Sequence, residues 1–280
     1  MKSPIDMGVV LITGASSGIG MEMARLLALR AKALVLLARR TERLEALAIE
    51  LRKKAPNLIV LVTPCDLSDA AACDAMLERV NAEAGPVDVL INNAGFGDVG
   101  VFDFVNWDRM AKMIGLNVTA LTYLCHRLVP GMVERGRGGV LNVSSGFGLT
   151  FGPGMAVYIG TKHFVTGFSE GLRLDLAGTG VRVTQVCPGP VATEFLEQAG
   201  NFTGLSMPGI VEISAERCAR TAIAAFDKGR ALVVPGILIR FLIFMGARTP
   251  RWILRLMYRP AASALRRKQL ALLAAKGGTR

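Results

Sequence analysis

A tyrosine and a lysine four residues apart are the side chains in this sequence best suited to proton transfer. Tyr158 and Lys162 lie in the segment GVLNVSSGFGLTFGPGMAVYIGTK, residues 139–162. In a helix this spacing places both side chains on one face, one turn apart. The lysine ammonium would favour the phenolate and lower the tyrosine pKa from its usual value of about 10. Tyr158 is therefore a candidate proton donor and acceptor, and Ser145 a candidate hydrogen-bonding partner for the same substrate oxygen.

A second chemical motif, TGASSGIG at residues 13–20, follows a short apolar run and precedes a helical pattern. Glycines at a strand-to-helix turn let the backbone approach a pyrophosphate closely. The helix N-terminus adds unpaired N–H groups and the positive end of its dipole. The motif in this context predicts a dinucleotide cofactor.

The end of the second apolar run distinguishes between the two nicotinamide cofactors. NAD sites normally carry an acid there that binds the ribose hydroxyls. This chain reads LVLLARRTERL, with Ala38 at that position, followed by Arg39 and Arg40. A carboxylate would repel a 2′-phosphate, whereas a guanidinium can bind it with paired hydrogen bonds. The sequence favours NADP(H), although Arg40 in particular could simply begin a solvated helix beside Glu42.

These residues need a scaffold, and the hydrophobic pattern predicts one. Apolar runs of strand length alternate with helical patterns such as residues 41–54 and 68–85, as in a parallel sheet covered on both faces. The predicted strands are residues 8–13, 33–38, 58–63, 87–92, 139–144, 181–186 and 231–235. The expected fold is α/β, a doubly wound Rossmann sheet with helices on both faces and a C-terminal helical extension.

The motifs together resemble the short-chain dehydrogenase/reductase family. NNAG at 92–95, Asn117 and PGPVAT at 188–193 accompany the two motifs above, in the family's order, over roughly residues 7–235. Ser145 lies 13 residues before Tyr158, and Asn117 lies 41 before it, which also agrees with the family. The resemblance implies transfer of hydride between a nicotinamide and a carbonyl or alcohol carbon, of the NADP-preferring ketoreductase type.

The resemblance also implies roles for individual residues. Tyr158 would be the general acid and base, Lys162 would lower its pKa and bind the nicotinamide ribose, Ser145 would orient the carbonyl, and Asn117 would hold a proton-relay water. Ser144, next to Ser145, is the alternative serine. The cofactor would lie along the turns after the strands, against Gly14, Ser16, Ser17, Gly18, Ile19 and Gly20 at the pyrophosphate; Arg39 and Arg40 at the 2′-phosphate; Asp66 and Leu67 at the adenine; Asn93, Ala94 and Gly95 at the adenosine ribose; Pro188, Val191 and Thr193 at the nicotinamide amide; and Tyr158 and Lys162.

The expected substrate is a hydrophobic ketone, for example a lipid-type one, because apolar residues follow each catalytic element. The candidate pocket residues are Phe96, Phe147, Leu149, Met155, Phe195, Leu196 and Met207. Plain core packing is the alternative for them. Residues 190–214 are expected to form a loop over the substrate. An NADP-binding scaffold or sensor acting through its tail is the competing function, but it would have no need of the catalytic set.

Charge and hydropathy set the last fifty residues apart. Residues 231–280 contain ten Lys and Arg and no Asp or Glu, out of a formal net charge of +11 for the 280-residue chain. The domain is therefore expected to end near residue 235, with 236–280 as a basic amphipathic extension. Pro235, Gly236 and Gly246 interrupt its apolar run, and a membrane span needs about 20 apolar residues, so no span is expected.

Three interpretations of this tail are open: peripheral contact with an anionic membrane surface, burial against the body or a second subunit, and nucleic-acid binding. The tail lacks a nucleic-acid recognition motif, so no nucleic-acid partner is expected. Two long helices, around 102–134 and 156–177, resemble the family's dimer-forming pair and predict a homodimer or a tetramer. Five scattered cysteines without a CxxC pair suggest no metal site and fit a cytoplasmic protein, with a peripheral location on the inner face of the membrane as the variant.

Overall fold

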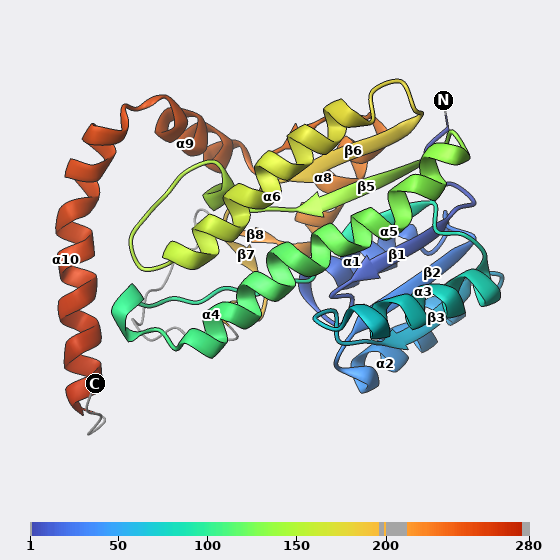
Figure 1. Ribbon diagram of the computed structural model, residues 1–280, viewed down its shortest axis with the longest axis horizontal. Coiled ribbons are helices and arrows are strands. Elements are labelled where there is room, and N and C mark those ends of the chain that lie inside the picture. The colour runs from blue at the N-terminus through green and yellow to red at the C-terminus, as the bar shows by residue number, and fades with distance from the viewer. Residues whose placement is uncertain (1, 196–198, 200–211, 276–280) are drawn as a thin grey trace.

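The computed structural model describes residues 2–195, 199 and 212–275. A seven-stranded parallel sheet in the order β3-β2-β1-β4-β5-β6-β9 forms its centre. Its strands are β1 (Val9–Thr13), β2 (Ala33–Ala38), β3 (Ile59–Pro64), β4 (Val89–Asn92), β5 (Gly138–Val143), β6 (Val181–Val186) and β9 (Leu232–Val233). Each matches a predicted strand, because continuous apolar runs suit strands buried on both faces. The doubly wound fold is confirmed (Figure 1).

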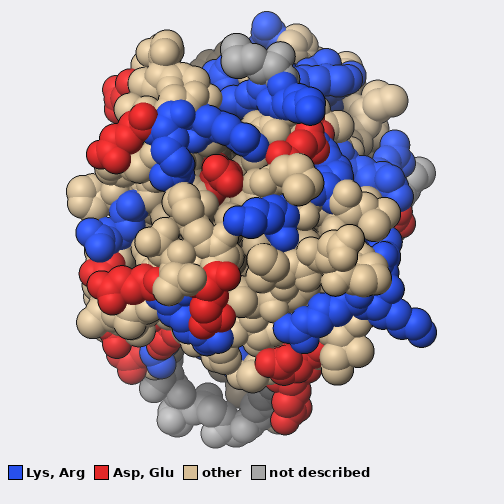
Figure 2. All heavy atoms as spheres, turned by 90° about the vertical axis from the view of Figure 1, so that its right-hand side faces the viewer, with Lys and Arg blue, Asp and Glu red and all other residues tan. Residues whose placement is uncertain are grey.

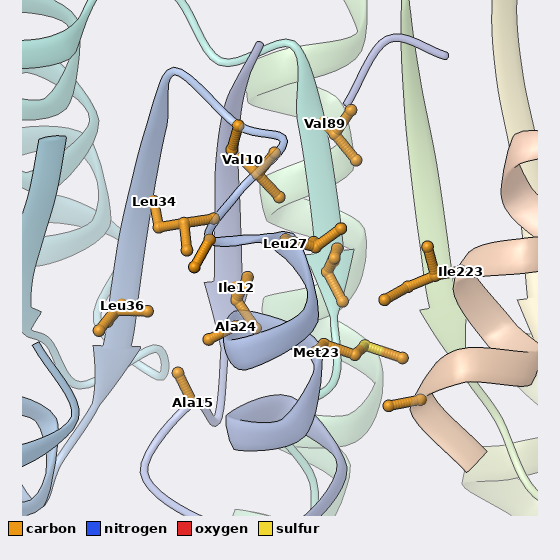
Figure 3. Close-up of a cluster of buried hydrophobic side chains, with 14 of the residues drawn as sticks. Val10, Ile12, Ala15, Met23, Ala24, Leu27, Leu34, Leu36, Val89 and Ile223 are labelled. Atoms are coloured by element: carbon orange, nitrogen blue, oxygen red, sulfur yellow. The ribbon is translucent and has the colours of Figure 1, made fainter. Parts of the chain in front are cut away.

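Helices cover both faces of the sheet. Helices α1 (Gly18–Leu27), α2 (Thr41–Lys54) and α8 (Ala215–Asp227) pack on one face, and α3 (Ala70–Ala84), α5 (Leu121–Glu134) and α6 (Ala156–Asp175) on the other. Figure 3 shows the first layer, where Met23 and Leu27 of α1 lie between the strands and Ile223 of α8. This buried apolar layer is what holds the glycine-rich turn before α1 in place.

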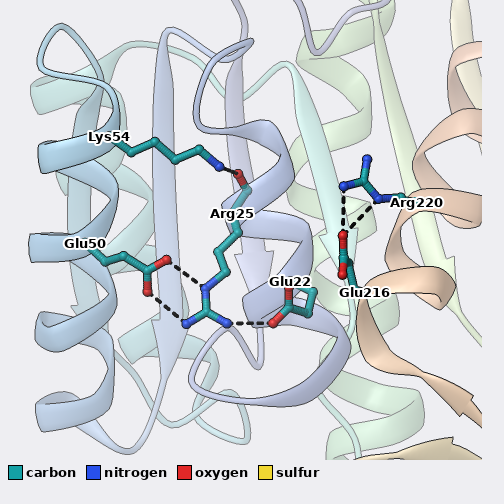
Figure 4. Close-up of polar contacts among 6 residues, drawn as sticks. All are labelled: Glu22, Arg25, Glu50, Lys54, Glu216 and Arg220. Carbon is teal, nitrogen blue, oxygen red and sulfur yellow. Dashed lines mark hydrogen bonds and ion pairs between the residues drawn. The ribbon is translucent and has the colours of Figure 1, made fainter.

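Surface ion pairs tie the first layer together. Arg25 of α1 bonds Glu50 of α2 through two nitrogens, at 2.9 and 2.8 Å, and also contacts Glu22 on its own helix (Figure 4). The hydrogen bond from Arg25 lowers the pKa of Glu50. Exposed pairs of this kind contribute at most about 1 kcal/mol each. They set helix register rather than overall stability.

One predicted helix begins later and is less regular than expected. The segment around 102–134 contains a short 3₁₀ turn (Phe102–Phe104), α4 (Trp107–Ile114), a π-helical turn (Gly115–Ala120) and then α5. Asn106 caps α4 by accepting hydrogen bonds from the N–H groups of Asp108 and Arg109, at 2.8 and 3.3 Å. An N-cap residue has non-helical dihedrals, so the helix starts at 107. The prediction of one helix from 102 is wrong in this respect.

Smaller elements complete the frame around the carboxyl ends of the strands. A 3₁₀ turn (Gly146–Gly148) follows β5, and the short strands β7 (Val191–Ala192) and β8 (Ile213–Ser214) pair in parallel. Most of the predicted substrate loop, including Leu196 and Met207, lies outside the described residues.

The tail forms two helices, α9 (Ile237–Arg248) and α10 (Arg251–Ala275), which confirms the helical extension. Gly246 does not break α9, which ends just before Pro250. Helix α10 lies along one end of the molecule (Figure 1). Within the described part of the chain, no helix is both long and apolar enough to cross a membrane.

Part of the tail packs on the body, as one of the three interpretations predicts. Leu254 and Leu265 of α10 are buried, and buried Gln269 accepts a 2.7 Å hydrogen bond from the N–H of Val101. Arg266 bonds both oxygens of Asp103, at 3.0 and 2.6 Å. The opposite face of the molecule mixes Lys and Arg with Asp and Glu (Figure 2). The basic excess lies in the tail, because residues 231–280 contain ten Lys and Arg and no Asp or Glu.

Candidate active site

One large cavity, of about 1280 Å³, lies at the carboxyl ends of the strands. The sheet order reverses direction between β1 and β4, and ligands of doubly wound folds bind at such a switch point. Of the catalytic and cofactor-binding residues predicted from sequence, all line this cavity except Gly20 and Asn117: Gly14, Ser16, Ser17, Gly18, Ile19, Arg39, Arg40, Asp66, Leu67, Asn93, Ala94, Gly95, Ser145, Tyr158, Lys162, Pro188, Val191 and Thr193. Residues from the six segments that follow β1 to β6 and from helix α6 thus meet in one space.

The glycine-rich turn is built for close approach of its backbone to a ligand. Gly14 and Gly18 have φ values of 66° and 56°, where glycine is favoured. Gly20 does not face the cavity but is needed for packing: a Cβ there would lie 2.4 Å from Nδ2 of Asn93. Ser17 is the N-cap of α1, yet its side chain makes no capping hydrogen bond. The first N–H groups of α1 are therefore not capped by that side chain, which fits the binding of a phosphate.

Asn93 joins the first and fourth strands beneath this turn. Its Nδ2 donates to the carbonyl oxygens of Thr13 and Gly14, at 2.9 and 3.1 Å. Thr13 Oγ1 in turn accepts from the N–H groups of Asn93 and Ala94, both at 2.9 Å. The amide nitrogen of the Asn93 side chain thus holds the turn in place.

The two arginines predicted at the 2′-phosphate differ in their surroundings. Arg39 is exposed at the cavity, and its charge contributes to the lowered pKa of Asp66, whose main cause is the hydrogen bond from the Ser68 N–H. Arg40 instead lies over the glycine-rich turn. Its guanidinium donates to Ser16 Oγ at 3.3 Å and to Ser17 Oγ at 2.7 Å.

Glu194 is a site residue that the sequence analysis missed. Its carboxylate accepts from Arg40 at 2.8 Å and also pairs with Arg43. The hydrogen bond from Arg40 is the largest cause that lowers the pKa of Glu194 to about 2. The contact joins the segment after β7 to the start of α2 across 154 residues of chain. No local pattern could have indicated it.

Ser145, Tyr158 and Lys162 come together at the inner end of the cavity. All three are buried. A hydrogen bond between the Ser145 hydroxyl and Tyr158 acts on the tyrosine pKa. Lys162 Nζ lies 5.8 Å from the Tyr158 ring centroid and donates to the Val143 carbonyl at 2.8 Å. Ser144 is turned away, hydrogen-bonded to the Lys162 carbonyl and to Thr166 at 3.1 and 2.9 Å.

The pKa of Tyr158 is shifted in the opposite direction from the one expected. Burial raises it to about 12, against a smaller lowering by the Ser145 hydrogen bond. Burial also lowers the pKa of Lys162 to about 8. The charged forms of both groups lose hydration in the interior, which raises the pKa of the phenol and lowers that of the amine. Burial thus outweighs the expected lowering of the Tyr158 pKa here, and an effect of Lys162 on that pKa stays a prediction.

Asn117 lies in the π-helical turn and is almost fully buried, at 1% exposed. Its Nδ2 donates to the Phe96 carbonyl at 3.0 Å and to Thr161 Oγ1 at 3.1 Å, while its Oδ1 accepts from the Phe96 N–H at 3.2 Å. The side chain therefore positions the loop after β4 against α6. Single π-helical turns often occur at functional sites. The water-holding role of Asn117 stays a prediction.

Part of the cavity lining is apolar, although charged residues such as Asp108, Arg109 and Lys112 also line the cavity. Four of the predicted pocket residues line it: Phe96, Phe147, Met155 and Phe195, the last with its ring centroid 5.4 Å from that of Tyr158. Leu149 does not line it. Two residues of the tail do, Ile239 and Ile243 of α9, which the sequence analysis had assigned to an appendage.

A glycine cradle at the switch point of a parallel sheet, with a Ser, Tyr and Lys set beside it, defines a Rossmann-fold oxidoreductase that uses a dinucleotide. Residues 8–203 match the family model described as short chain dehydrogenase. The chain belongs to the short-chain dehydrogenase/reductase family, whose members act on small carbonyl or alcohol substrates.

Three known proteins show the likeness in more detail. The chain is 39% identical over 193 residues to the NADP-dependent 3-hydroxy acid dehydrogenase of Salmonella typhi, covering 67% of this chain and 74% of that protein. A short-chain dehydrogenase from Sphingobium yanoikuyae in complex with NADPH superposes with a TM-score of 0.76 at 35% identity, covering 86% and 93% of the two chains. A bulky-bulky ketone specific alcohol dehydrogenase from Comamonas testosteroni superposes with a TM-score of 0.72 at 30% identity, covering 87% and 92%.

Proposed function

We propose that this protein reduces a hydrophobic ketone to a secondary alcohol with NADPH. The observation that carries the proposal is a single cavity that joins the glycine cradle, the buried Ser145, Tyr158 and Lys162, and an apolar part of the lining. A scaffold or sensor would need the cradle alone. The test is NADPH consumption over a panel of ketones graded by chain length and ring type, with wild type run beside Tyr158→Phe.

The residues divide the work of the reaction. When bound, the nicotinamide supplies the hydride to the carbonyl carbon. Tyr158 donates a proton to the carbonyl oxygen, and Ser145 donates a hydrogen bond to that oxygen as its negative charge develops. With a pKa near 12, Tyr158 keeps its proton throughout the physiological range, which suits the direction of reduction. Lys162 holds the nicotinamide ribose, and Asn117 keeps the neighbouring loop in place.

The preference for NADPH over NADH rests on the end of β2. Ala38 lines the cavity where an acid would bind ribose hydroxyls, and Arg39 is exposed beside it. Arg40 lies over the turn, where its charge is paired with the Glu194 carboxylate. The NADPH complex of the Sphingobium yanoikuyae enzyme and the NADP-dependent Salmonella typhi enzyme support this preference.

The hydrophobic substrate rests on the apolar part of the cavity lining. Phe96, Phe147, Met155 and Phe195 line the same cavity as Tyr158, and the Phe195 ring packs beside the Tyr158 ring. Such a lining favours alkyl or aromatic groups on the ketone. The bulky ketones handled by the Comamonas testosteroni enzyme are of the same kind. A lipid-like ketone fits this lining.

The rate should depend on pH through Lys162. We expect kcat/KM for NADPH to fall as pH rises above about 8, because burial lowers the pKa of the lysine to about 8 and the neutral amine holds the nicotinamide ribose less strongly. Below that pH the ammonium is present and the profile is flat. Initial rates between pH 6 and 10 measure this. A profile that stays level to pH 10 would refute it, and Lys162→Met should lack the descending limb.

The outer side of the tail is proposed to contact an anionic membrane surface. Apolar side chains are exposed together on α9 and the first half of α10: Phe241, Phe244, Met245, Trp252, Leu256 and Met257. The exposed Arg251, Arg255 and Arg259 lie among them at intervals of four, and the tail contains no acid. Apolar residues flanked by arginines suit the headgroup region of a bilayer.

Flotation with vesicles tests the membrane contact. We expect the protein to float with phosphatidylserine-containing vesicles at low salt, and the triple variant Arg251→Gln, Arg255→Gln, Arg259→Gln to lose most of this binding, since each basic residue near the surface contributes about 1 kcal/mol. The control removes three arginines elsewhere: Arg79→Gln, Arg127→Gln, Arg220→Gln. Equal flotation of both triple variants would exclude an electrostatic role for the tail.

The homodimer also stays a proposal. Helix α6 exposes Phe164, stacked on Phe168 with ring centroids 5.8 Å apart, and Leu174. An exposed apolar row on a long helix suits a partner helix of a second copy.

A further inference from the structure

Helix α9 has one side against the active site. Ile239 and Ile243, one turn apart, line the cavity, while Ile237 on the same helix is 75% exposed. The two inward residues reach the loops that carry the chemistry. A Cβ added to Gly189 would lie 2.8 Å from Ile239 Cδ1, and one added to Gly146 would lie 2.9 Å from Ile243 Cδ1. The isoleucines therefore occupy the space that side chains at these two glycines would need.

The two glycines belong to the catalytic loops. Gly146 directly follows Ser145, and its N–H donates to the carbonyl of Pro188 at 2.7 Å. Gly189 follows Pro188. Because both loops carry a glycine where α9 contacts them, the helix can approach the loops next to Ser145 and Pro188 closely. Ile239 and Ile243 are apolar and line the cavity, so they suit contact with an apolar group of a substrate.

Helix α10 holds α9 in this position. Beyond α9 the chain turns at Pro250, and α10 runs back over the loop that leads into α6. Leu265 packs on Gly154, where a Cβ would lie 2.4 Å from its Cδ2, and Tyr258 meets Phe151 edge to face at 5.8 Å between centroids. Gln269 and Arg266 fasten the far half of α10 to residues 101 and 103. Because these contacts hold α10 against the body, they also hold α9, which precedes it, in place beside the cavity.

We propose that Ile239 and Ile243 determine which ketones this enzyme accepts, by closing the apolar part of the cavity to larger substituents. The inference deepens the proposed reductase function and rests on it. It assigns part of the substrate site to the C-terminal extension, beyond the residues 8–203 that match the family model. The side-chain volume at positions 239 and 243 limits the size of the substituent that a ketone can carry on the side of its carbonyl carbon that faces α9.

The test compares substrate preference in three matched isoleucine variants. A graded series of alkyl phenyl ketones, from methyl to octyl, is reduced in lipid-free buffer. We expect Ile243→Ala and Ile239→Ala each to raise kcat/KM for the largest ketone relative to the smallest by about 10-fold, the effect of one or two methylene groups in a hydrophobic pocket. Ile237→Ala makes the same chemical change on the exposed side of the helix and should leave the ratio within about twofold of wild type.

A variant with a larger side chain at position 243 tests the opposite effect, a smaller cavity. Ile243→Trp should lower kcat/KM for the largest ketone by more than about 10-fold while the smallest is still reduced. The dissociation constant for NADPH, measured by its fluorescence, should not change in any of these proteins. An unchanged ketone ratio in both alanine variants and the tryptophan variant, with wild type active, would overturn this inference alone. Wild type that reduces no ketone while binding NADPH would instead overturn the proposed function.

Discussion

Tyr158→Phe is expected to reduce kcat/KM for ketone reduction by on the order of 10³-fold while the protein binds NADPH as well as wild type does. The substitution removes one buried hydroxyl and leaves the ring, which packs at 5.4 Å from the Phe195 ring. The hydride can then still reach the carbonyl carbon, but the oxygen receives no proton from the enzyme. The loss should therefore appear in turnover and not in the binding of the cofactor.

Tyr123→Phe is the matched control for this experiment. Tyr123 lies on helix α5, and its hydroxyl donates a hydrogen bond to Asp74 Oδ1 of helix α3 at 2.7 Å. Neither residue lines the cavity. This variant should keep wild-type turnover, so that a loss in Tyr158→Phe alone reflects position rather than the removal of a phenol. Stopped-flow single turnovers separate hydride transfer from product release. Near-wild-type single-turnover rates in Tyr158→Phe would contradict the mechanism, including its use of Tyr158 as the proton donor.

Ala38→Asp is expected to lower kcat/KM with NADPH by on the order of 100-fold and to raise that with NADH. The carboxylate would stand at the end of β2 beside Arg39, where the 2′-phosphate is expected. Placing like charges together costs several kcal/mol, and about 3 kcal/mol corresponds to this factor. With NADH the same carboxylate accepts hydrogen bonds from two ribose hydroxyls.

Ala38→Asn separates charge from size in this prediction. The amide has the shape of the carboxylate without its charge, so it should weaken NADPH binding by a small factor and should not improve NADH as strongly. Kinetics with each cofactor at a fixed ketone concentration give the ratio. If Ala38→Asp and Ala38→Asn behave alike, the 2′-phosphate does not lie at this position, and the assignment of Arg39 and Arg40 would have to change.

The frame of the site was predictable from local pattern. The strands are nearly continuous apolar runs, and α2 occupies the predicted residues 41–54. A parallel sheet brings the carboxyl ends of such strands to one edge, so motifs that follow them must meet there. For this reason the glycine-rich turn and the pair Tyr158 and Lys162 could be placed together without a structure.

Several features of the site depend on contacts between distant segments. Glu194 meets Arg40 although 154 residues separate them, and no spacing rule connects the two. The direction of the Tyr158 pKa shift depends on how deeply the phenol is buried. A helical spacing of four says that two side chains share a face, but it does not say how deeply that face is buried.

The tail shows the same division most clearly. Its lack of acids, its arginines and its helical pattern could all be read from the sequence. The sequence could not show that one side of α9 lines the cavity. The residues of α9 are apolar on nearly all sides, so no polar face marks the outer side of the helix. The sequence by itself determined the fold, the catalytic set and the chemistry it can support, because these follow from short-range spacing on a regular sheet. Only the tertiary structure decided the pKa values and the inner wall of the cavity, because both arise from which distant surfaces come into contact.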